Sequence, residues 1–240
     1  MASKGGPDIS ENGMVLYLDA SNTRSYPGSG TTWTDLSGNN YDGTLTNGPT
    51  FNSGNGGSIV FNASTQYVDT ANTSGLNFTN TSATVSVWIK TSASFPSGAY
   101  IVAKQMDATG GWSIDLASTG IPYFETKNNA SGATACYRFA TVVCNNGVWH
   151  NVVATFTTST SVVANNTITM YVDGVSSNST LNQLLTYGGN TSENIKIGRR
   201  TVSSVDAYNG NISNVQIYNR LLSANEVLQN YNATKSRFGL

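Results

Sequence analysis

The sequence contains little charge of either sign. Only 10% of its 240 residues are charged and the formal net charge is −1, whereas about 25% of residues are charged in an average soluble domain. Such a chain has no strong positive field with which to attract nucleic acid or an anionic membrane. The basic clusters, at Arg199-Arg200 and in residues 235–240, are small and fit a solvated edge or a protein contact better. We therefore expect no nucleic-acid partner.

Long apolar runs are also missing. No segment approaches the roughly 20 apolar residues that a membrane-spanning helix needs. The N-terminal stretch MASKGGPDISENG has no apolar core of the kind found in a signal peptide, and the first apolar run, Met14–Leu18, is short. The sequence therefore predicts no membrane span and gives no support for classical secretion.

Cysteine is scarce, and its spacing predicts neither a metal site nor a simple disulfide. Cys136 and Cys144 are the only two cysteines. On one continuous strand their Cα atoms would lie about 26 Å apart, whereas a disulfide needs a separation under about 7 Å. No glycine or proline between them marks a reversal of the chain, and the CxxC spacing of many metal sites is absent. We favour two free thiols.

Acidic residues are few and scattered along the chain. None of the four glutamates has an acidic neighbour two or four positions further on, the spacing that places two carboxyl groups on one face of a strand. Glycoside hydrolysis needs two carboxyl groups about 5–10 Å apart. Asp115 and Glu125 lie on neighbouring predicted strands, but the sequence leaves their alignment open. A G-x-S-x-G nucleophile motif is also absent, so we predict that the protein is not an enzyme.

The sequence does contain many short stretches with a two-residue period. In TVSVWIK, for example, Val85, Val87 and Ile89 share one face, and β-branched and aromatic residues with this period favour strands. The predicted strands are Met14–Leu18, Ser58–Phe61, Ala83–Lys90, Tyr100–Lys104, Trp112–Leu116, Pro122–Thr126, Ala133–Phe139, Trp149–Phe156, Thr167–Val172, Asn194–Gly198 and Asn211–Tyr218. Many short strands without alternating helices are typical of a sandwich or barrel.

Two short motifs in the C-terminal part of the sequence predict a turn and the start of a helix. Asp173-Gly174, between two apolar stretches, predicts a type I′ turn in which both residues have positive φ. Ser223, three residues before Glu226, forms the pattern of a capping box. This pattern predicts a short helix from about Ala224 to Tyr231, which would be the only sustained helix in the chain.

His150, the only histidine, lies inside the predicted strand Trp149–Phe156. Its neighbours are apolar, and no serine or cysteine nucleophile motif accompanies it. We expect a packed, hydrogen-bonded side chain rather than a catalytic base. No linker or composition shift divides the chain, so the sequence predicts an N-terminal arm, residues 1–12, followed by one domain, residues 13–240.

Three blocks in order resemble a known family. They are LYLDASNTRSY followed by WTDLSGNNYDGTLTN, then VSVWIK, GVWHNVVATF and ITMYVDGV, and finally IKIGRR with YNGNISNVQIYNRLLSANEVLQNY. Their order is similar to the concanavalin A-like lectin/glucanase superfamily, in its laminin G-like branch. The resemblance implies an all-β fold, a two-sheet antiparallel jelly-roll sandwich with one short C-terminal helix, and no fixed activity. The opening block resembles the versions found in bacteriophage structural proteins.

The resemblance also implies two kinds of candidate site. Carbohydrate binding would use an aromatic platform, for which strand position makes Trp112, Tyr123 and Tyr137 candidates, although aromatics in sandwiches more often lie in the core. A structural calcium would use oxygen-rich turns, where Asp19, Asp35 and Asp42 fall. The alternative is that these aspartates only close Asx-turns. The family often has two aspartates where this chain has Ser213 and Asn214, which should weaken a calcium site.

Three functions remain open from the sequence. The first is a non-enzymatic virion structural protein that decorates or cements a phage particle or is displayed on its surface, contacts capsid proteins, is homo-oligomeric there and adheres to host-surface glycans. Its N-terminal arm would be held against a partner. The second is a stand-alone, extracellular carbohydrate-binding module. The third, which we rank last, is a glycoside hydrolase.

Overall fold

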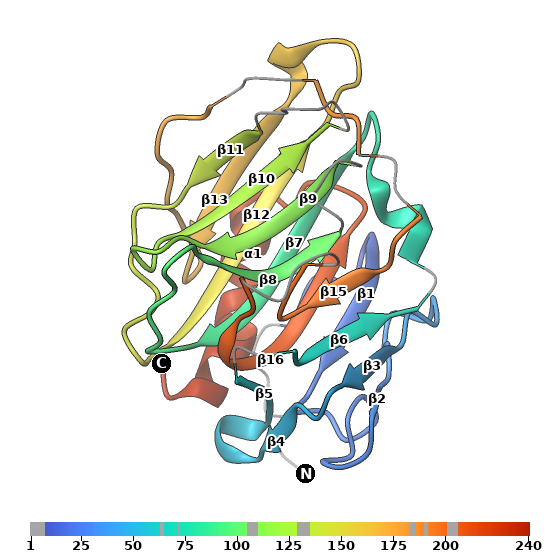
Figure 1. Cartoon of the computed structure of the whole chain (residues 1–240), viewed down its shortest axis with the longest axis vertical. Coiled ribbons are helices and arrows are strands. Elements are labelled where there is room, and N and C mark those ends of the chain that lie inside the picture. The colour runs from blue at the N-terminus through green and yellow to red at the C-terminus, as the bar shows by residue number, and fades with distance from the viewer. Residues whose placement is uncertain are drawn as a thin grey trace.

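Two antiparallel sheets of eight strands each form the body of the computed structural model (Figure 1). The structure describes residues 8–62, 65–71, 73–104, 110–128, 135–182, 186–189, 192–200 and 206–240. This arrangement confirms the predicted all-β sandwich. Every strand pair within the two sheets is antiparallel.

The first sheet places strands from both ends of the chain side by side. Its order is β14 (Val175–Ser176), β13 (Thr167–Val172), β12 (Trp149–Thr157), β7 (Ser82–Lys90), β16 (Asn209–Tyr218), β5 (Ser58–Asn62) and β4 (Thr50–Asn52). β1 (Met14–Asp19) also pairs with β16, beyond the end of β5.

The second sheet packs against the first and lies toward the viewer in Figure 1. Its order is β11 (Cys136–Phe139), β10 (Pro122–Lys127), β9 (Gly111–Leu116), β8 (Ala99–Lys104), β15 (Ile195–Ile197), β6 (Tyr67–Thr70), β3 (Gly43–Thr46) and β2 (Thr32–Trp33).

The two-residue period explains the core. Val85, Val87 and Ile89 of β7 are fully buried and face the second sheet, as predicted, where Ile114 and Phe124 meet them in one apolar cluster. Sheet faces that pack about 10 Å apart bury alternate residues in this way. The chain thereby leaves the intervening residues of each strand on the two outer faces.

Each predicted strand overlaps an observed one, but the predicted strands do not include β2, β3, β4, β6 and β14. The last has two residues and directly follows the Asp173-Gly174 turn, and the other four are short and contain glycine, threonine or asparagine in place of an apolar run. Gly43 in β3 is instructive, because a Cβ there would lie 2.6 Å from Cγ1 of Val68. This glycine is required because the neighbouring strand β6 approaches closely, and not because the chain turns here. Residues 133 and 134 of the predicted strand before β11 lie outside the described residues.

The local signals are confirmed. Asp173 and Gly174 both have positive φ, 53° and 79°, as a type I′ turn requires. Ser223 and Glu226 form a capping box at the start of α1 (Ala224–Thr234). Four 3₁₀ segments complete the described elements: η1 (Gly54–Gly56), η2 (Thr73–Asn77), η3 (Val163–Asn165) and η4 (Lys235–Phe238). Among the described residues, none of these helical segments has the length and hydropathy that a membrane crossing requires.

α1 and η4 cover the outer face of the first sheet (Figure 1). Leu222 and Val227 pack on Val153 and Tyr218. Trp88 stacks on Phe238, with ring centroids 4.1 Å apart, and on Tyr231. A second layer of apolar contacts therefore covers part of this face, and the outer face of the second sheet has no such helical cover among the described residues.

The C-terminal helix also holds the described part of the N-terminal arm. Gln229 Nε2 donates to the carbonyl of Asp8, and the Ser10 amide donates to Asn230 Oδ1. Residues 1–7 lie outside the described residues, so the rest of the arm stays a prediction.

His150 is buried and hydrogen-bonded, as expected, and the two cysteines are buried as well. His150 Nδ1 lies 2.8 Å from Asp173 Oδ2, and its Nε2 lies 3.1 Å from Asn146 Oδ1. Cys136 and Cys144 are free, and burial raises their pKa values to about 11 and about 12. Because the thiolate is the nucleophile and the metal ligand, both thiols are unreactive at neutral pH.

Candidate functional site

The outer face of the second sheet brings chemically active side chains together. Along β9, Trp112 and Ile114 point into the core, so Ser113 and Asp115 point to the outer face. Trp112 is fully buried, and its Nε1 donates to the carbonyl of Leu76 over 2.9 Å. The prediction that Trp112 belongs to a binding platform is therefore corrected, because its ring packs between the sheets.

Tyr123 and Tyr137, by contrast, lie half-buried on this outer face. Phe139 contacts both of them: its ring centroid lies 4.8 Å from that of Tyr123 and 5.6 Å from that of Tyr137. Asn182 Nδ2 donates to the Tyr137 hydroxyl over 2.7 Å. We call Tyr123, Tyr137 and Phe139 the aromatic cluster. Phe139 was not singled out from the sequence, although it shares the two-residue period of Tyr137 in β11.

Two carboxylates lie beside the aromatic cluster. Asp115 of β9 is paired with Tyr123 of β10, and Glu125 of β10 is paired with Ser113 of β9. The carboxylates are therefore diagonal neighbours on the same face, an arrangement in which Cα atoms lie about 7–8 Å apart. The sequence left this alignment open. Acidic residues that are distant along the chain do converge here, because antiparallel pairing brings neighbouring strands into register.

Both carboxylates are almost completely buried. Asp115 is 1% exposed, and Glu125 is 7% exposed. Ser113 Oγ donates to Asp115 Oδ2 over 2.5 Å, but Asp115 Oδ1 accepts no hydrogen bond from any residue that the structure describes. Lys127 Nζ lies 3.4 Å from Glu125 Oε1. A buried oxygen without a donor costs the folded state about 1–3 kcal/mol.

Burial shifts the proton equilibria of this pair. It raises the pKa of Asp115 well above the ordinary range, and the charge of Glu125 adds to this effect. Burial also raises the pKa of Glu125, whereas the Lys127 ammonium opposes the change. The pair therefore holds a proton more tightly in the folded protein than in the unfolded chain.

Arg200 and Asp206 border the carboxylates on the side of β8. Arg200 Cζ lies 5.1 Å from the centroid of the Tyr100 ring, and Arg200 Nη2 lies 3.6 Å from Asp206 Oδ2. Tyr100 itself is the cross-strand partner of Asp115. Across the outer face, the aromatic cluster lies next to the two carboxyl groups, and these lie next to the Arg200 guanidinium. This combination of groups suits a polyhydroxylated ligand.

Replacing Asp115 with asparagine is expected to stabilise the protein at neutral pH. The folded-state pKa of Asp115 is raised, so below the unfolded pKa the group is protonated in both states and the stability of the folded protein is at its full value. As pH rises from the unfolded pKa toward the folded pKa, the unfolded chain releases the proton first, and the free energy of unfolding falls. The free energy of unfolding of Asp115→Asn should therefore match that of the wild type at about pH 3.5. It should exceed the wild-type value by about 1–3 kcal/mol at pH 7.

Urea unfolding at a series of pH values measures this difference, with Glu11→Gln, a change at an exposed carboxylate, as the control. An Asp115→Asn variant that is less stable than the wild type at pH 7 would show that the carboxylate supports the fold instead.

The three aspartates predicted as calcium ligands accept hydrogen bonds from the protein. Asp35 accepts four, from amides and a hydroxyl: Tyr17 N, Ser37 N, Ser37 Oγ and Tyr41 N. Asp42 Oδ1 accepts from the Asp35 amide over 2.8 Å, which brings these two residues together. Asp19 instead pairs with Arg237, whose Nη1 lies 2.8 Å from Oδ2. These contacts support the alternative interpretation as turn-closing residues.

Within the described ranges, no group of three or more His, Cys, Asp or Glu side chains is placed to hold a metal ion. A structural calcium stays a prediction.

Comparisons with known proteins agree with this fold. A laminin G-type family model, described as the concanavalin A-like lectin/glucanases superfamily, matches residues 62–228. No curated protein matches the sequence.

Several solved structures share the fold at low sequence identity. The binding domain of Paraclostridial Mosquitocidal Protein 1 has a TM-score of 0.66 and 17% identity, over 93% of this chain and 52% of that one. Domain 4 of AbnA, an extracellular arabinanase from Geobacillus stearothermophilus in complex with arabinotriose, has a TM-score of 0.64 and 16% identity, over 91% and 98%. Trypanosoma rangeli sialidase has a TM-score of 0.64 and 15% identity, over 99% and 35%.

This chain thus spans about half of the toxin binding domain, about a third of the sialidase and almost all of the arabinanase domain.

Proposed function

Because the chain belongs to the concanavalin A-like lectin/glucanases superfamily, we propose that it is a non-enzymatic glycan-binding protein. Its glycan lies on the outer face of the second sheet, across β9, β10 and β11. One observation carries this proposal: the half-buried rings of the aromatic cluster, Tyr123, Tyr137 and Phe139, lie together on this face.

The chemistry of this face suits a sugar. A pyranose ring has apolar C–H faces, which pack on aromatic rings, and a rim of hydroxyls that donate and accept hydrogen bonds. Ligand sites commonly combine aromatic side chains with a few placed polar groups in this way. Phe139 and Tyr123 supply the apolar contact, and the half-buried Lys127 ammonium donates to a hydroxyl.

The names of the structural neighbours support binding as the role of such a domain. One is a toxin binding domain, another is the receptor binding domain of botulinum neurotoxin type G, and a third is an arabinanase domain in complex with arabinotriose. These statements concern those proteins, and the identities of 13–17% carry over the fold alone.

Glycoside hydrolysis is the second candidate, because Asp115 and Glu125 are diagonal neighbours on one face. In a glycosidase, however, both carboxyl groups must flank the scissile bond. Here Asp115 is 1% exposed and Glu125 is paired with Lys127, so neither carboxyl group projects from the sheet toward a bound sugar. Mass spectrometry of each bound oligosaccharide after prolonged incubation tests this point. Turnover that disappears in Asp115→Asn and Glu125→Gln would replace adhesion by hydrolysis.

A glycan array, probed with and without calcium, tests the proposal itself. We expect a group of related oligosaccharides to bind the intact chain. An array without binders in either condition would contradict the proposal. Binding that requires calcium would favour the prediction that Asp19, Asp35 and Asp42 are calcium ligands over the interpretation that they only close turns.

We further propose that the protein lies on the surface of a phage particle. This location is supported by the resemblance of the opening block to phage structural proteins and by the described arm residues, which run along α1 on the side opposite the glycan face. Such a protein would attach to capsid proteins, as a homo-oligomer, through the helix-covered side and present the second sheet outward. Mass spectrometry of purified particles from the source checks for the chain and its copy number. An unchanged copy number after deletion of residues 1–12 would contradict attachment by the arm.

A further inference from the structure

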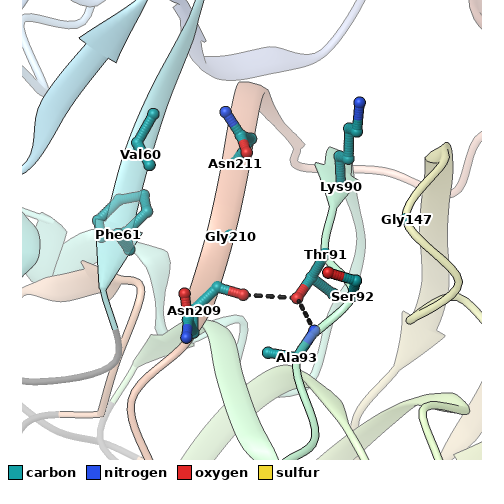
Figure 2. A pocket seen from close by; sticks show the side chains of 10 residues that line it. All are labelled: Val60, Phe61, Lys90, Thr91, Ser92, Ala93, Gly147, Asn209, Gly210 and Asn211. Carbon is teal, nitrogen blue, oxygen red and sulfur yellow. Dashed lines mark hydrogen bonds between the residues drawn. The ribbon is translucent and has the colours of Figure 1, made fainter.

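A row of side chains crosses the outer face of the first sheet where β7 ends and β16 begins. Val60, Asn211, Lys90 and Trp149 are successive cross-strand partners on β5, β16, β7 and β12. Two cavities, of about 390 Å³ and about 50 Å³, border this row, and both Lys90 and Asn211 line each of them. In Figure 2 the Lys90 and Asn211 side chains point the same way from neighbouring strands.

Lys90 is half-buried here without a counter-ion. Its Nζ makes no hydrogen bond or ion pair with any residue that the structure describes, whereas Lys127 and Lys196 each contact a carboxylate. An anion supplied by a ligand would give this ammonium an acidic partner.

The wall of the larger cavity is preorganised. Thr91 Oγ1 donates to the carbonyl of Asn209 and accepts from the Ala93 amide over 3.0 Å (Figure 2). This bond ties the segment after β7 to the start of β16. Gly210 between them has a φ of 148°, and a Cβ there would lie 2.5 Å from the carbonyl oxygen of Lys90. A side chain at position 210 would therefore clash with the Lys90 backbone, so only glycine fits here.

Part of the remaining lining is polar and uncharged, and Val60, Phe61 and Ala93 add apolar surface. The amides of Asn209 and Asn211 and the hydroxyl of Ser92 surround the same cavity. Asn211 Nδ2 donates to Ser58 Oγ over 3.0 Å, which fixes its orientation. A volume of about 390 Å³ falls at the lower end of the range of about 300–1,000 Å³ for small-molecule sites.

One cation, oriented amides and a hydroxyl define the ligand chemistry. We propose that this cavity binds a monosaccharide unit that carries a carboxylate, with the carboxylate at Lys90 Nζ and the sugar hydroxyls at Asn209 and Asn211. The site lies on the sheet opposite the aromatic cluster, so it goes beyond the proposed glycan face and does not rest on it.

Titration of the ¹⁵N-labelled chain with glucuronic acid, glucose and acetate tests this assignment. Glucuronate is expected to shift the amide signals of residues 90–93 and 209–211 and to bind at least about tenfold more tightly than glucose or acetate, since hydrogen bonds to charged groups contribute about 1.5–3 kcal/mol. Lys90→Met should abolish the preference over glucose. Ser92→Trp, which fills the mouth of the cavity and keeps the lysine, should abolish binding of all three.

Arg24→Met is the matched control, because Arg24 is an exposed cation outside the cavity, and its titration should equal that of the wild type. A glucuronate preference that survives Lys90→Met, or falls equally in Arg24→Met, would overturn the proposal. So would acetate that binds as tightly as glucuronate, because the sugar would then not be recognised. Shifts confined to β9–β11 would also overturn it, whereas failure of the glycan face alone leaves the signals of residues 90–93 and 209–211 unaffected.

Discussion

Replacing Phe139 with alanine is expected to weaken glycan binding by about tenfold to a hundredfold. Phe139 is the ring that contacts both Tyr123 and Tyr137. Its removal takes away apolar contact area and also leaves the two tyrosines without their common neighbour. Truncation of a central aromatic in a binding surface typically costs more than about 1–2 kcal/mol, and each 1.4 kcal/mol is about a factor of ten in affinity.

Isothermal titration with an oligosaccharide selected on the array measures this effect. Tyr67→Ala is the matched control, because Tyr67 is a half-buried tyrosine on β6, three strands beyond β9 in the same sheet. It contacts Lys196 and Arg199 rather than the aromatic cluster. Equal losses in the two variants would show that general stability of the sheet, and not the aromatic cluster, determines affinity.

Replacing Trp88 with alanine is expected to lower the free energy of unfolding by about 3–5 kcal/mol, the usual range for a buried tryptophan or phenylalanine. Trp88 is 2% exposed and stacks on Phe238 and Tyr231. Its Nε1 donates to Thr234 Oγ1 over 3.0 Å. One side chain therefore holds the end of α1 and the whole of η4 against the first sheet.

Urea unfolding gives the stability of this variant, and Leu228→Ala, at an exposed position of α1, is the control. The control should change the free energy of unfolding by less than about 0.5 kcal/mol. Oligosaccharide affinity, measured at low temperature where Trp88→Ala is still folded, should stay at the wild-type value, because the glycan face lies on the other sheet. A Trp88→Ala variant of wild-type stability would contradict the role of the helical cover.

The strands of the core follow from the sequence because burial imposes a strict period. Val85, Val87 and Ile89 point into the core and alternate with Ser86, Trp88 and Lys90 on the other face, and such alternation identifies a strand. The strands that were missed, such as β3, are held by their neighbours. Gly43 fits in β3 because its lack of a side chain leaves room for Val68. Nothing in the sequence around Gly43 predicts this contact.

The candidate site was predicted in part, and the reason for the failure is register. Tyr123 and Tyr137 were chosen from strand position, and they do lie on one outer face beside Phe139. Trp112 was chosen by the same reasoning, but it points inward, because alternation along β9 places Asp115 outward instead. A shift of one residue exchanges the two faces of a strand.

The pairing of Asp115 with Glu125 depends even more on register. Ten positions separate the two along the chain, and only the observed alignment of β9 with β10 makes them diagonal neighbours. Sequence spacing identifies carboxylate pairs on a single strand and cannot identify pairs across two strands. The buried oxygen of Asp115 and the aromatic cluster become one surface only in the folded chain.

The most direct measurement of the glycan face is a chemical-shift map of the ¹⁵N-labelled chain with an oligosaccharide selected on the array. We predict that the largest shifts fall on β9, β10 and β11, around Asp115, Tyr123 and Phe139. Shifts that fall elsewhere, with β9–β11 unchanged by a bound oligosaccharide, would contradict the account.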